Sequence, residues 1–290
     1  MDTIVQLGIA GLAMGMIYAL VALGFVLIFN SVNVVNFAQG DFAMLPAFVL
    51  SFFFTSLGLN IYLAAACTIV FAVVFGLAFN QLVYHPLRNR SFVPVIIATI
   101  GVSVFLQNIS LAVFGADPRG VPPFAEGTAS IFGTTVNAQY LVIIAATAAL
   151  LVGQYLVFER TSLGKKLQAT AQNRDMARLL GINTNLMVAL TFAYSAVLGA
   201  VAGILVSPLF GVTTTLGTII ALKAFAATVI GGFGSVPGAV LGALFLGLIE
   251  IFGARYVSAD YKDAFAFVIL ILVLLLRPQG FFGEKVAQKA

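Results

Sequence analysis

Residues 7–29 read LGIAGLAMGMIYALVALGFVLIF and contain no charged side chain. A helix of about 20 predominantly apolar residues is long enough to cross the hydrocarbon core of a bilayer. The run is too long for the core of a signal peptide, and neither a basic leader nor a small-residue cleavage site accompanies it. We therefore expect it to form a retained first membrane-spanning helix.

The rest of the chain is also strongly apolar. Of its 290 residues, 61% are hydrophobic and 8% are charged, whereas a soluble domain is about 25% charged. The sequence therefore predicts an all-α polytopic membrane protein in which residues 1–290 form a single transmembrane domain. The apolar segments number about nine and cover residues 5–29, 42–58, 61–84, 92–114, 139–158, 186–208, 217–232, 238–254 and 263–276.

The seventh apolar segment, 217–232, differs from the others. It is short, it carries Lys223, and it ends in the flexible run GGFGSVPG. A full crossing and a half-span that re-enters the membrane are both compatible with this pattern. Within and after the segment, four glycines are candidates for a hinge, namely Gly231, Gly232, Gly234 and Gly238. Glycine pairs at four-residue spacing, such as Gly11 and Gly15, predict close packing of helices.

Basic residues in the loops predict the orientation, because they concentrate on the cytoplasmic side. With the N-terminus outside and the C-terminus inside, ten basic residues fall inside and three fall outside. This imbalance favours an odd number of crossings. The inside set is Arg88, Arg90, Arg160, Lys165, Lys166, Arg174, Arg178, Arg277, Lys285 and Lys289, and the outside set is Arg119, Arg255 and Lys262.

The loop at about 159–185 has the pattern of a short amphipathic helix, or of two helices broken near Asn173. Leu163, Leu167 and Ala171 are spaced four apart, and Met176, Leu179 and Leu180 continue the apolar stripe with a shift of phase. Gly181 stands where a helix C-cap glycine belongs. Such a helix either lies on anionic lipid or inserts into a groove of a partner.

The outside loop at about 115–138 holds three prolines and then a polar, β-branched stretch around Gly133. We expect a short hairpin or an irregular cap there. A solvated loop and a docking surface are equally compatible with this composition.

The stretch NVVNFAQGDF, residues 33–42, places several polar groups between the first two apolar segments. Irregular backbone at membrane depth is tolerated where protein buries it or where it lines a water-filled cavity. We therefore expect a gate or lining at the inner end of a substrate pathway. The alternative is a polar turn that caps the second span, with Asp41 as its N-cap. The candidate residues are Asn33, Asn36, Gln39, Gly40 and Asp41.

Two ionisable residues lie inside apolar segments, where charges are costly and are usually functional or paired. Lys223 is a further candidate for the substrate pathway, and snorkelling to the interface is its alternative. Glu250 lies near the outer end of its segment and close to Arg255, which suggests an interfacial ion pair. The irregular runs NFAQGD and GGFGSVPGA roughly match each other, which hints at an internal inverted repeat.

The chain lacks the sequence signatures of several other protein classes. It has no G-x-x-x-x-G-K-[ST] phosphate loop, so we expect no ATPase site of its own and no enzymatic activity. One cysteine, Cys67, and one histidine, His85, provide neither a disulfide nor a Cys/His metal cluster. We expect no metal, no cofactor and no nucleic-acid partner.

Three stretches together resemble the branched-chain amino acid permease family of the LivH type. They are VVNFAQGDFAMLPAF at 34–48, the segment Leu163 to Leu205, and the segment Leu222 to Glu250. The resemblance extends over nearly the whole chain. In one departure, many members carry histidine where this chain has Gln39, and often glutamate where it has Asp41.

The resemblance implies a permease subunit of an ABC importer that moves leucine, isoleucine and valine across the inner membrane. Its partners would be a second related permease or a second copy, two ATPase subunits and a periplasmic binding protein. Urea and short-amide permeases share the pattern and remain an alternative, as does an ion-coupled secondary transporter. The implied ATPase-coupling residues, in the loop helix at 163–180 and its C-cap, are Leu163, Gly164, Leu167, Ala171, Arg174, Met176, Arg178, Leu179 and Gly181.

Overall fold

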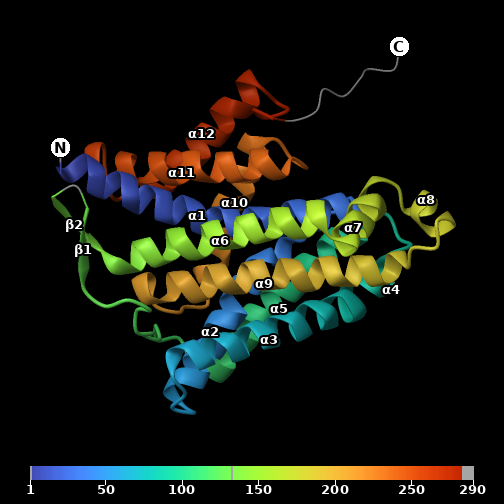
Figure 1. The fold of residues 1–290 in the computed structure, drawn as a ribbon, viewed down its shortest axis with the longest axis horizontal. Coiled ribbons are helices and arrows are strands. Elements are labelled where there is room, and N and C mark those ends of the chain that lie inside the picture. The colour runs from blue at the N-terminus through green and yellow to red at the C-terminus, as the bar shows by residue number, and fades with distance from the viewer. Residues whose placement is uncertain (1, 132, 283–290) are drawn as a thin grey trace.

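Each predicted apolar segment forms a helix in the computed structural model, which describes residues 2–131 and 133–282 (Figure 1). These helices are α1 (Asp2–Val32), α2 (Asp41–Thr55), α3 (Ile61–Phe79), α5 (Phe92–Phe114), α6 (Ala138–Arg160), α9 (Thr184–Phe210), α10 (Leu216–Gly231), α11 (Val236–Tyr256) and α12 (Lys262–Leu276). Short elements connect them: η1 (Phe37–Gln39), η2 (Asn80–Tyr84), α4 (His85–Leu87), α7 (Ser162–Gln172) and α8 (Arg174–Leu179).

The all-α polytopic prediction is confirmed. Among the described residues, seven helical segments are long and apolar enough to cross a membrane. The helix α10 has 16 residues, so it extends about 24 Å at about 1.5 Å per residue and falls short of a bilayer core of about 30 Å. The number of crossings and the orientation stay predictions.

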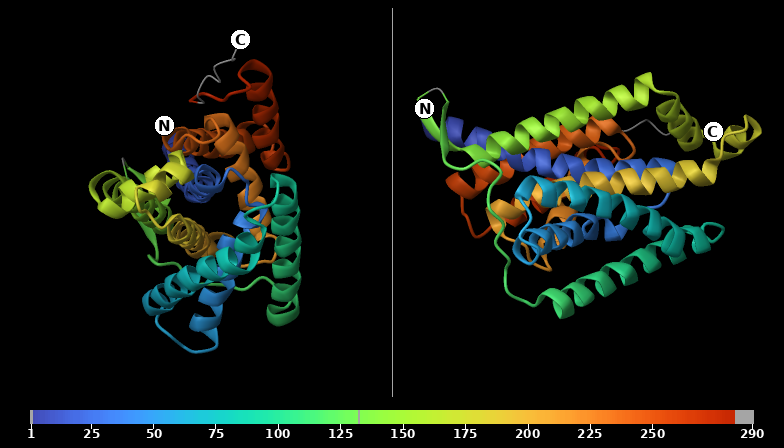
Figure 2. Two further views of the ribbon diagram at one scale, coloured as in Figure 1. Left: turned by 90° about the vertical axis from the view of Figure 1, so that its right-hand side faces the viewer. Right: turned by 60° about the horizontal axis from the view of Figure 1, so that its bottom comes forward.

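Helix α1 forms the centre of the bundle. It packs against α11, α9, α10 and α6, and side chains along it such as Ile17, Leu20 and Leu23 are fully buried. The helices α2 and α3 pack on α9, while α5 stands at the edge and contacts α2 and η1 (Figure 2). The bundle therefore encloses α1 and leaves α5 with one face uncovered.

The two large loops lie at opposite ends of the bundle (Figure 1). At one end, the side-chain amide of Gln6 donates to the carbonyl of Thr135 in the hairpin of β1 (Thr128–Ile131) and β2 (Thr134–Asn137). The hairpin expected around Gly133 is confirmed, with antiparallel pairing and a positive φ of 80° at that glycine. At the other end, α7 and α8 lie beside the end of α1. Lys285 and Lys289, which contributed to the predicted orientation, lie outside the described residues.

Large apolar side chains cover the outer surfaces of α3, α5 and α6. Val70, Phe105 and Val152 are each about 60% exposed or more. Apolar surface on this scale suits contact with lipid, because in water it would favour association.

The predicted small-residue pairs mark places where helices touch backbone to backbone. A Cβ added at Gly15 would lie 2.8 Å from the Cα of Leu244 in α11, and one added at Gly199 would lie 2.9 Å from Phe42 in α2. Gly242 of α11 likewise faces the backbone of α10. Glycine at these positions permits the close approach that membrane helices use for packing.

Candidate functional site

The polar stretch 33–41 leaves the end of α1 and turns back into the bundle. Asn33 ends α1 in the left-handed region, with φ of 53°, and it stays exposed. Asn36 then caps η1 through its side-chain oxygen, which accepts from the backbone N–H of Ala38. Asparagine is among the few residues that adopt the left-handed conformation readily, which explains why α1 stops here.

Gln39 lies inside the bundle and is fully buried. Its side-chain oxygen accepts from the hydroxyl of Ser195 in α9, which also contacts the carbonyl of Gly24 in α1. Gly24 lies eight residues before Val32, the last residue of α1, which corresponds to about 12 Å along the helix. The stretch therefore carries polar groups to membrane depth. Whether this stretch gates or lines the inner end of a substrate pathway stays a prediction.

Asp41 is the first residue of α2, and Gly40 occupies the N-cap position without a side-chain cap. The alternative in which Asp41 is the N-cap of this helix is therefore wrong. Its Oδ1 atom instead accepts from the side-chain amide of Gln107 in α5, at 3.4 Å. Gly40 faces Gly217 of α10, with no space for a Cβ on either residue, and this contact fixes where α2 begins.

Three buried polar atoms of this stretch have no hydrogen-bond partner among the described residues. They are Asn36 Nδ2, Gln39 Nε2 and Asp41 Oδ2. A buried polar atom without a partner costs about 1–3 kcal/mol, and more when it is charged. A cluster of such atoms in one stretch therefore points to a site that another molecule completes.

A cavity of about 350 Å³ lies beside Asp41, between η1, α5 and α10. Its polar lining comes from Asp41, Ser103, Gln107 and Thr218, and its remaining lining is mainly apolar. The volume falls within the range of about 300–1,000 Å³ for small-molecule sites, and an apolar wall with a few polar groups is typical of them. The apolar lining consists of Phe25, Phe37, Gly40, Ile100, Val104, Ala221, Leu222 and Phe225.

Lys223 does not line this cavity. Its ammonium group lies 2.5 Å from Glu250 of α11 and 2.7 Å from Asp263 of α12. The hydroxyl of Tyr18 in α1 donates to the other oxygen of Glu250, at 2.7 Å. These groups border a separate cavity of about 220 Å³. The structure thus separates Lys223 from the stretch 33–41 with which it was grouped.

The expected ion pair of Glu250 with Arg255 is also wrong. Five residues of helix rotate a side chain by about 140°, so the two side chains point to different faces of α11. Glu250 is 4% exposed and faces Lys223, whereas Arg255 is on the exposed side. A buried carboxylate requires a partner that is buried with it, and Lys223 meets that requirement.

The glycine run after α10 forms a tight reversal into α11. Gly232 and Gly234 have φ values of 106° and 94°, which only glycine adopts readily. Gly231 and Gly238 face each other in close contact across the turn. The carbonyl of Gly234 accepts from the side chain of Asn30, near the end of α1. A hinge function for these glycines, and an inverted repeat, stay predictions.

The loop at 159–185 forms two helices, α7 and α8, which break at Asn173 as expected. The side chain of Asn173 caps α8 by accepting from the backbone N–H groups of Asp175 and Met176. Gly181 ends the segment with φ of 77°, and the backbone N–H of Ile182 bonds the carbonyl of Ala177. This is the C-cap predicted from the glycine.

The predicted coupling residues divide into an inner and an outer group. Gly164 packs on the backbone of Phe158, Leu167 is 9% exposed, and Ala171 lines a pocket with residues of α1. Met176 and Leu179 are 60% and 82% exposed. Leu163 and Leu180 are exposed as well, at 43% and 78%. The single apolar stripe of the sequence therefore divides between packing on α1 and an open apolar face on α8.

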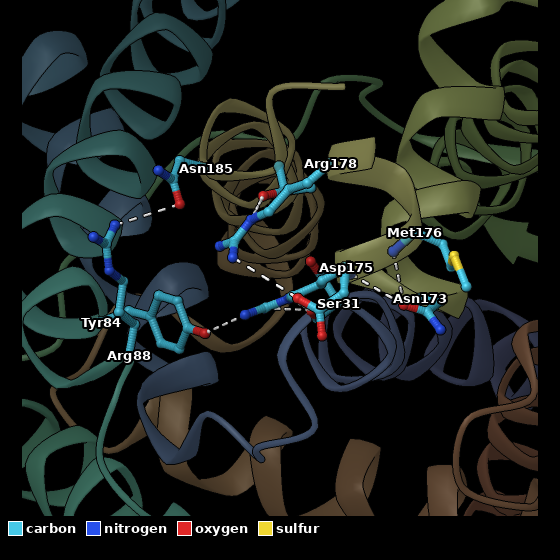
Figure 3. A network of polar contacts seen from close by, with 10 residues as sticks. Ser31, Tyr84, Arg88, Asn173, Asp175, Met176, Arg178 and Asn185 are labelled. Atoms are coloured by element: carbon cyan, nitrogen blue, oxygen red, sulfur yellow. Dashed lines mark hydrogen bonds and ion pairs between the residues drawn. The ribbon is translucent and has the colours of Figure 1, made fainter. Parts of the chain in front are cut away.

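Arg174 points inward and bonds α8 to the transmembrane helices. Its guanidinium donates twice to the carbonyl of Ser31 in the last turn of α1, from Nε at 2.9 Å and also from Nη2. Nη1 donates to the hydroxyl of Tyr84, at 3.0 Å. Arg178 donates to Thr184, the first residue of α9 (Figure 3). Arg174 therefore joins α8 directly to the end of α1, just before the stretch 33–41.

The sequence did not predict the partners of these residues. Gln107 could have been identified from the sequence, because a glutamine inside an apolar span is a signal of function. Ser103, Thr218 and Ser195 carry no such signal, since short hydroxyl side chains in a span bond their own helix. Tyr18 and Tyr84 carry no signal in the sequence either, because a tyrosine within an apolar run is common.

A bundle of apolar helices around polar groups at membrane depth defines a polytopic transport protein. Comparison with known families identifies the family of transport protein. The chain matches the family described as "Branched-chain amino acid transport system / permease component" over residues 8–274, and it belongs to this family. It is therefore a multi-pass protein of the inner membrane.

Two relatives illustrate the similarity. The chain is 36% identical to the high-affinity branched-chain amino acid transport system permease protein BraD of Pseudomonas aeruginosa, over 96% of this chain and 95% of that protein. It is 33% identical to the protein LivH of Escherichia coli K12, which bears the same description, with the same coverage.

A solved structure has the same overall fold. It is "PsaBC from Streptococcus pneumoniae in complex with Fab", with a TM-score of 0.50 and 15% identity. The similarity covers 94% of this chain and 91% of that chain. At this identity it supports the fold alone.

The buried charge network leads to a prediction for Lys223. Lys223→Met should lower the stability of the bundle by about 3–5 kcal/mol, because it leaves a buried carboxylate without its cation. The double variant Lys223→Met/Glu250→Gln should recover most of the loss, since the two buried charges are then removed and the remaining carboxylate, Asp263, is 53% exposed and solvated. Thermal unfolding in detergent would measure this. Lys262→Met is the control, because that ammonium lies over the ring of Phe210, and an unchanged Lys223→Met would contradict the pairing.

Proposed function

We propose that this chain is the permease subunit of an ABC importer for branched-chain amino acids. The observation that carries the proposal is the unpaired carboxylate oxygen of Asp41 beside a cavity with mainly apolar walls. An amino acid with an aliphatic side chain has the complementary chemistry. The names of the relatives with 33–36% identity support the same substrate class.

In this proposal the substrate ammonium bonds Asp41 Oδ2. A charge-assisted hydrogen bond of this kind is stronger than a neutral one. The hydroxyls of Ser103 and Thr218 are then available to the substrate carboxylate, and Ile100, Val104 and Phe225 contact its aliphatic side chain. Urea or a short amide has no ammonium group and could offer Asp41 only neutral N–H donors, which bind a carboxylate less strongly than an ammonium group does. This difference favours an amino acid over that alternative.

A second permease subunit, either a related chain or a second copy, would cover the cavity. The cavity opens between α5 and α10, where Ile100, Val104 and Leu222 are 45%, 54% and 49% exposed. Its polar groups would otherwise face lipid tails, which cannot hydrogen-bond. A pathway between two subunits places Asp41 in contact with substrate and away from lipid.

Of the two proposed ATPase subunits, one would dock on the open apolar face formed by Met176 and Leu179 of α8 and the adjoining Leu180, and the other on the second permease subunit. Amphipathic helices bind partners by inserting such side chains into a groove. Arg174 then passes the displacement to the end of α1 and to the stretch 33–41. A periplasmic binding protein would deliver the substrate at the opposite end.

An ion-coupled transporter is the second candidate, and the carboxylates of Glu250 and Asp263 are the observation that favours it. Both carboxylates contact Lys223, so they are less available to bind a coupling ion. Uptake into vesicles that requires ATP but no ion gradient would eliminate this candidate.

The ammonium contact gives a prediction for Asp41. Asp41→Asn should lower leucine uptake about ten- to a hundredfold, because one charge-assisted hydrogen bond is worth about 1.5–3 kcal/mol. The measurement is leucine uptake by proteoliposomes that hold the complete importer. Asp117→Asn, at an exposed carboxylate of the outer loop, should leave uptake unchanged. Full leucine uptake by Asp41→Asn would rule out the contact, and uptake of urea in place of leucine would favour the other substrate class.

The docking face gives a prediction for Leu179. Leu179→Asp should reduce co-purification of the ATPase subunits at least tenfold, because it places a charge in an apolar contact. The control is Leu57→Asp, at a leucine that is 56% exposed between α2 and α3. Equal co-purification for both variants would place the ATPase elsewhere.

A further inference from the structure

Three arginines converge at the end of the bundle that carries α8. Arg88 follows α4, and Arg174 and Arg178 come from α8, yet all three line one pocket of about 50 Å³. Tyr84, Arg88, Arg178 and Asn185 surround this space in Figure 3. The remaining lining residues are Asn80, Tyr84, His85, Asn89, Thr184, Asn185 and Val188.

Apart from one exposed carboxylate, the groups that bond these arginines carry no negative charge to balance them. Arg88 bonds His85 and Asn185, Arg174 bonds Ser31 and Tyr84, and Arg178 bonds Thr184. The one carboxylate paired with them among the described residues is Asp175. It lies 3.9 Å from Arg178, and its side chain is 92% exposed, so water screens most of its effect.

A helix terminus adds to the positive potential of the pocket. Thr184 and Asn185, which line it, are the first two residues of the 27-residue helix α9. The N-terminus of a helix carries a partial positive charge and attracts anions. Three guanidinium groups and this terminus therefore surround a space whose complementary occupant is an anion.

We propose that this pocket binds the phosphate of an anionic phospholipid in the leaflet on the α8 side. The planar guanidinium group matches the oxygen geometry of phosphate. A volume of about 50 Å³ admits one such group and excludes a nucleotide. Basic pockets between membrane helices on the cytoplasmic side are suited to lipid head groups.

The surroundings favour a lipid over an acidic side chain of a partner protein. The pocket lies where η2, α4 and α9 reach the end of the bundle, and the neighbouring segments expose large apolar side chains. Leu82, Phe92 and Leu186 are 76%, 63% and 50% exposed. Acyl chains would cover these side chains while the phosphate occupies the pocket. The apolar docking face of α8, in contrast, consists of Met176, Leu179 and Leu180.

A bound phosphate would hold α8, α9 and the segment after α4 together. It would reduce the repulsion between Arg88, Arg174 and Arg178 and so stabilise the contact of Arg174 with the end of α1. This site does not depend on the transported substrate, so the proposed function stands whether or not the lipid binds.

The test compares Arg88→Gln with Arg90→Gln. Arg90 is exposed in the same loop but does not line the pocket. Each protein is reconstituted in phosphatidylcholine nanodiscs with and without phosphatidylglycerol, and the phospholipid retained after detergent extraction is measured by native mass spectrometry. We expect Arg88→Gln to retain about tenfold less phosphatidylglycerol, since it loses a charge-assisted contact, and Arg90→Gln to match the parent protein.

Other outcomes would overturn the proposal. Equal retention by all proteins, or an equal loss in both variants, would mean that the pocket is not the site. Binding of inorganic phosphate that depends on Arg88, with no phosphatidylglycerol retained by the parent protein, would identify a site for a free anion. Unchanged lipid retention with loss of ATPase co-purification in Arg88→Gln would assign the pocket to an acidic partner residue. Arg88→Lys keeps the charge without the planar fork, and it should show intermediate retention even if Arg88→Gln folds poorly.

Discussion

A polar chain segment inside a bilayer must find its hydrogen bonds within the protein, because lipid tails supply none. The stretch 33–41 shows how this constraint organises the molecule. It enters the bundle between α1, α5, α9 and α10, where Ser195 and Gln107 contact Gln39 and Asp41. The helices around it are held close by glycine contacts such as Gly40 with Gly217. The polar atoms left unpaired mark the place where substrate would complete the site.

The same end of α1 connects this stretch to α7 and α8. Arg174 bonds the carbonyl of Ser31, and two residues later Asn33 ends the helix. A hydrogen bond therefore joins α8 to the end of α1, and the chain continues from there to the cavity beside Asp41. We infer that ATP hydrolysis by a partner acts on the cavity through this path.

Composition and apolar run length predicted the helices, because a bilayer leaves few other structures available. The break at Asn173, the C-cap at Gly181 and the hairpin around Gly133 followed from local residue preferences, and the structure confirms all three. Contacts between distant helices could not be predicted in this way. The partner of Glu250 is Lys223, 27 residues away, and not its near neighbour Arg255. Helical periodicity indicates the face of a side chain but not the helix that it meets, and for this reason the inward position of Arg174 was also missed.

The most direct test of the proposed path is the ratio of leucine transported to ATP hydrolysed in proteoliposomes that hold Arg174→Gln. This variant removes the paired contact with Ser31 and leaves the apolar docking face of α8 unchanged. The proposed path predicts that the ATPase subunits stay bound and hydrolyse ATP while leucine uptake falls. An unchanged ratio would contradict it, because α8 would then act on the cavity without the end of α1.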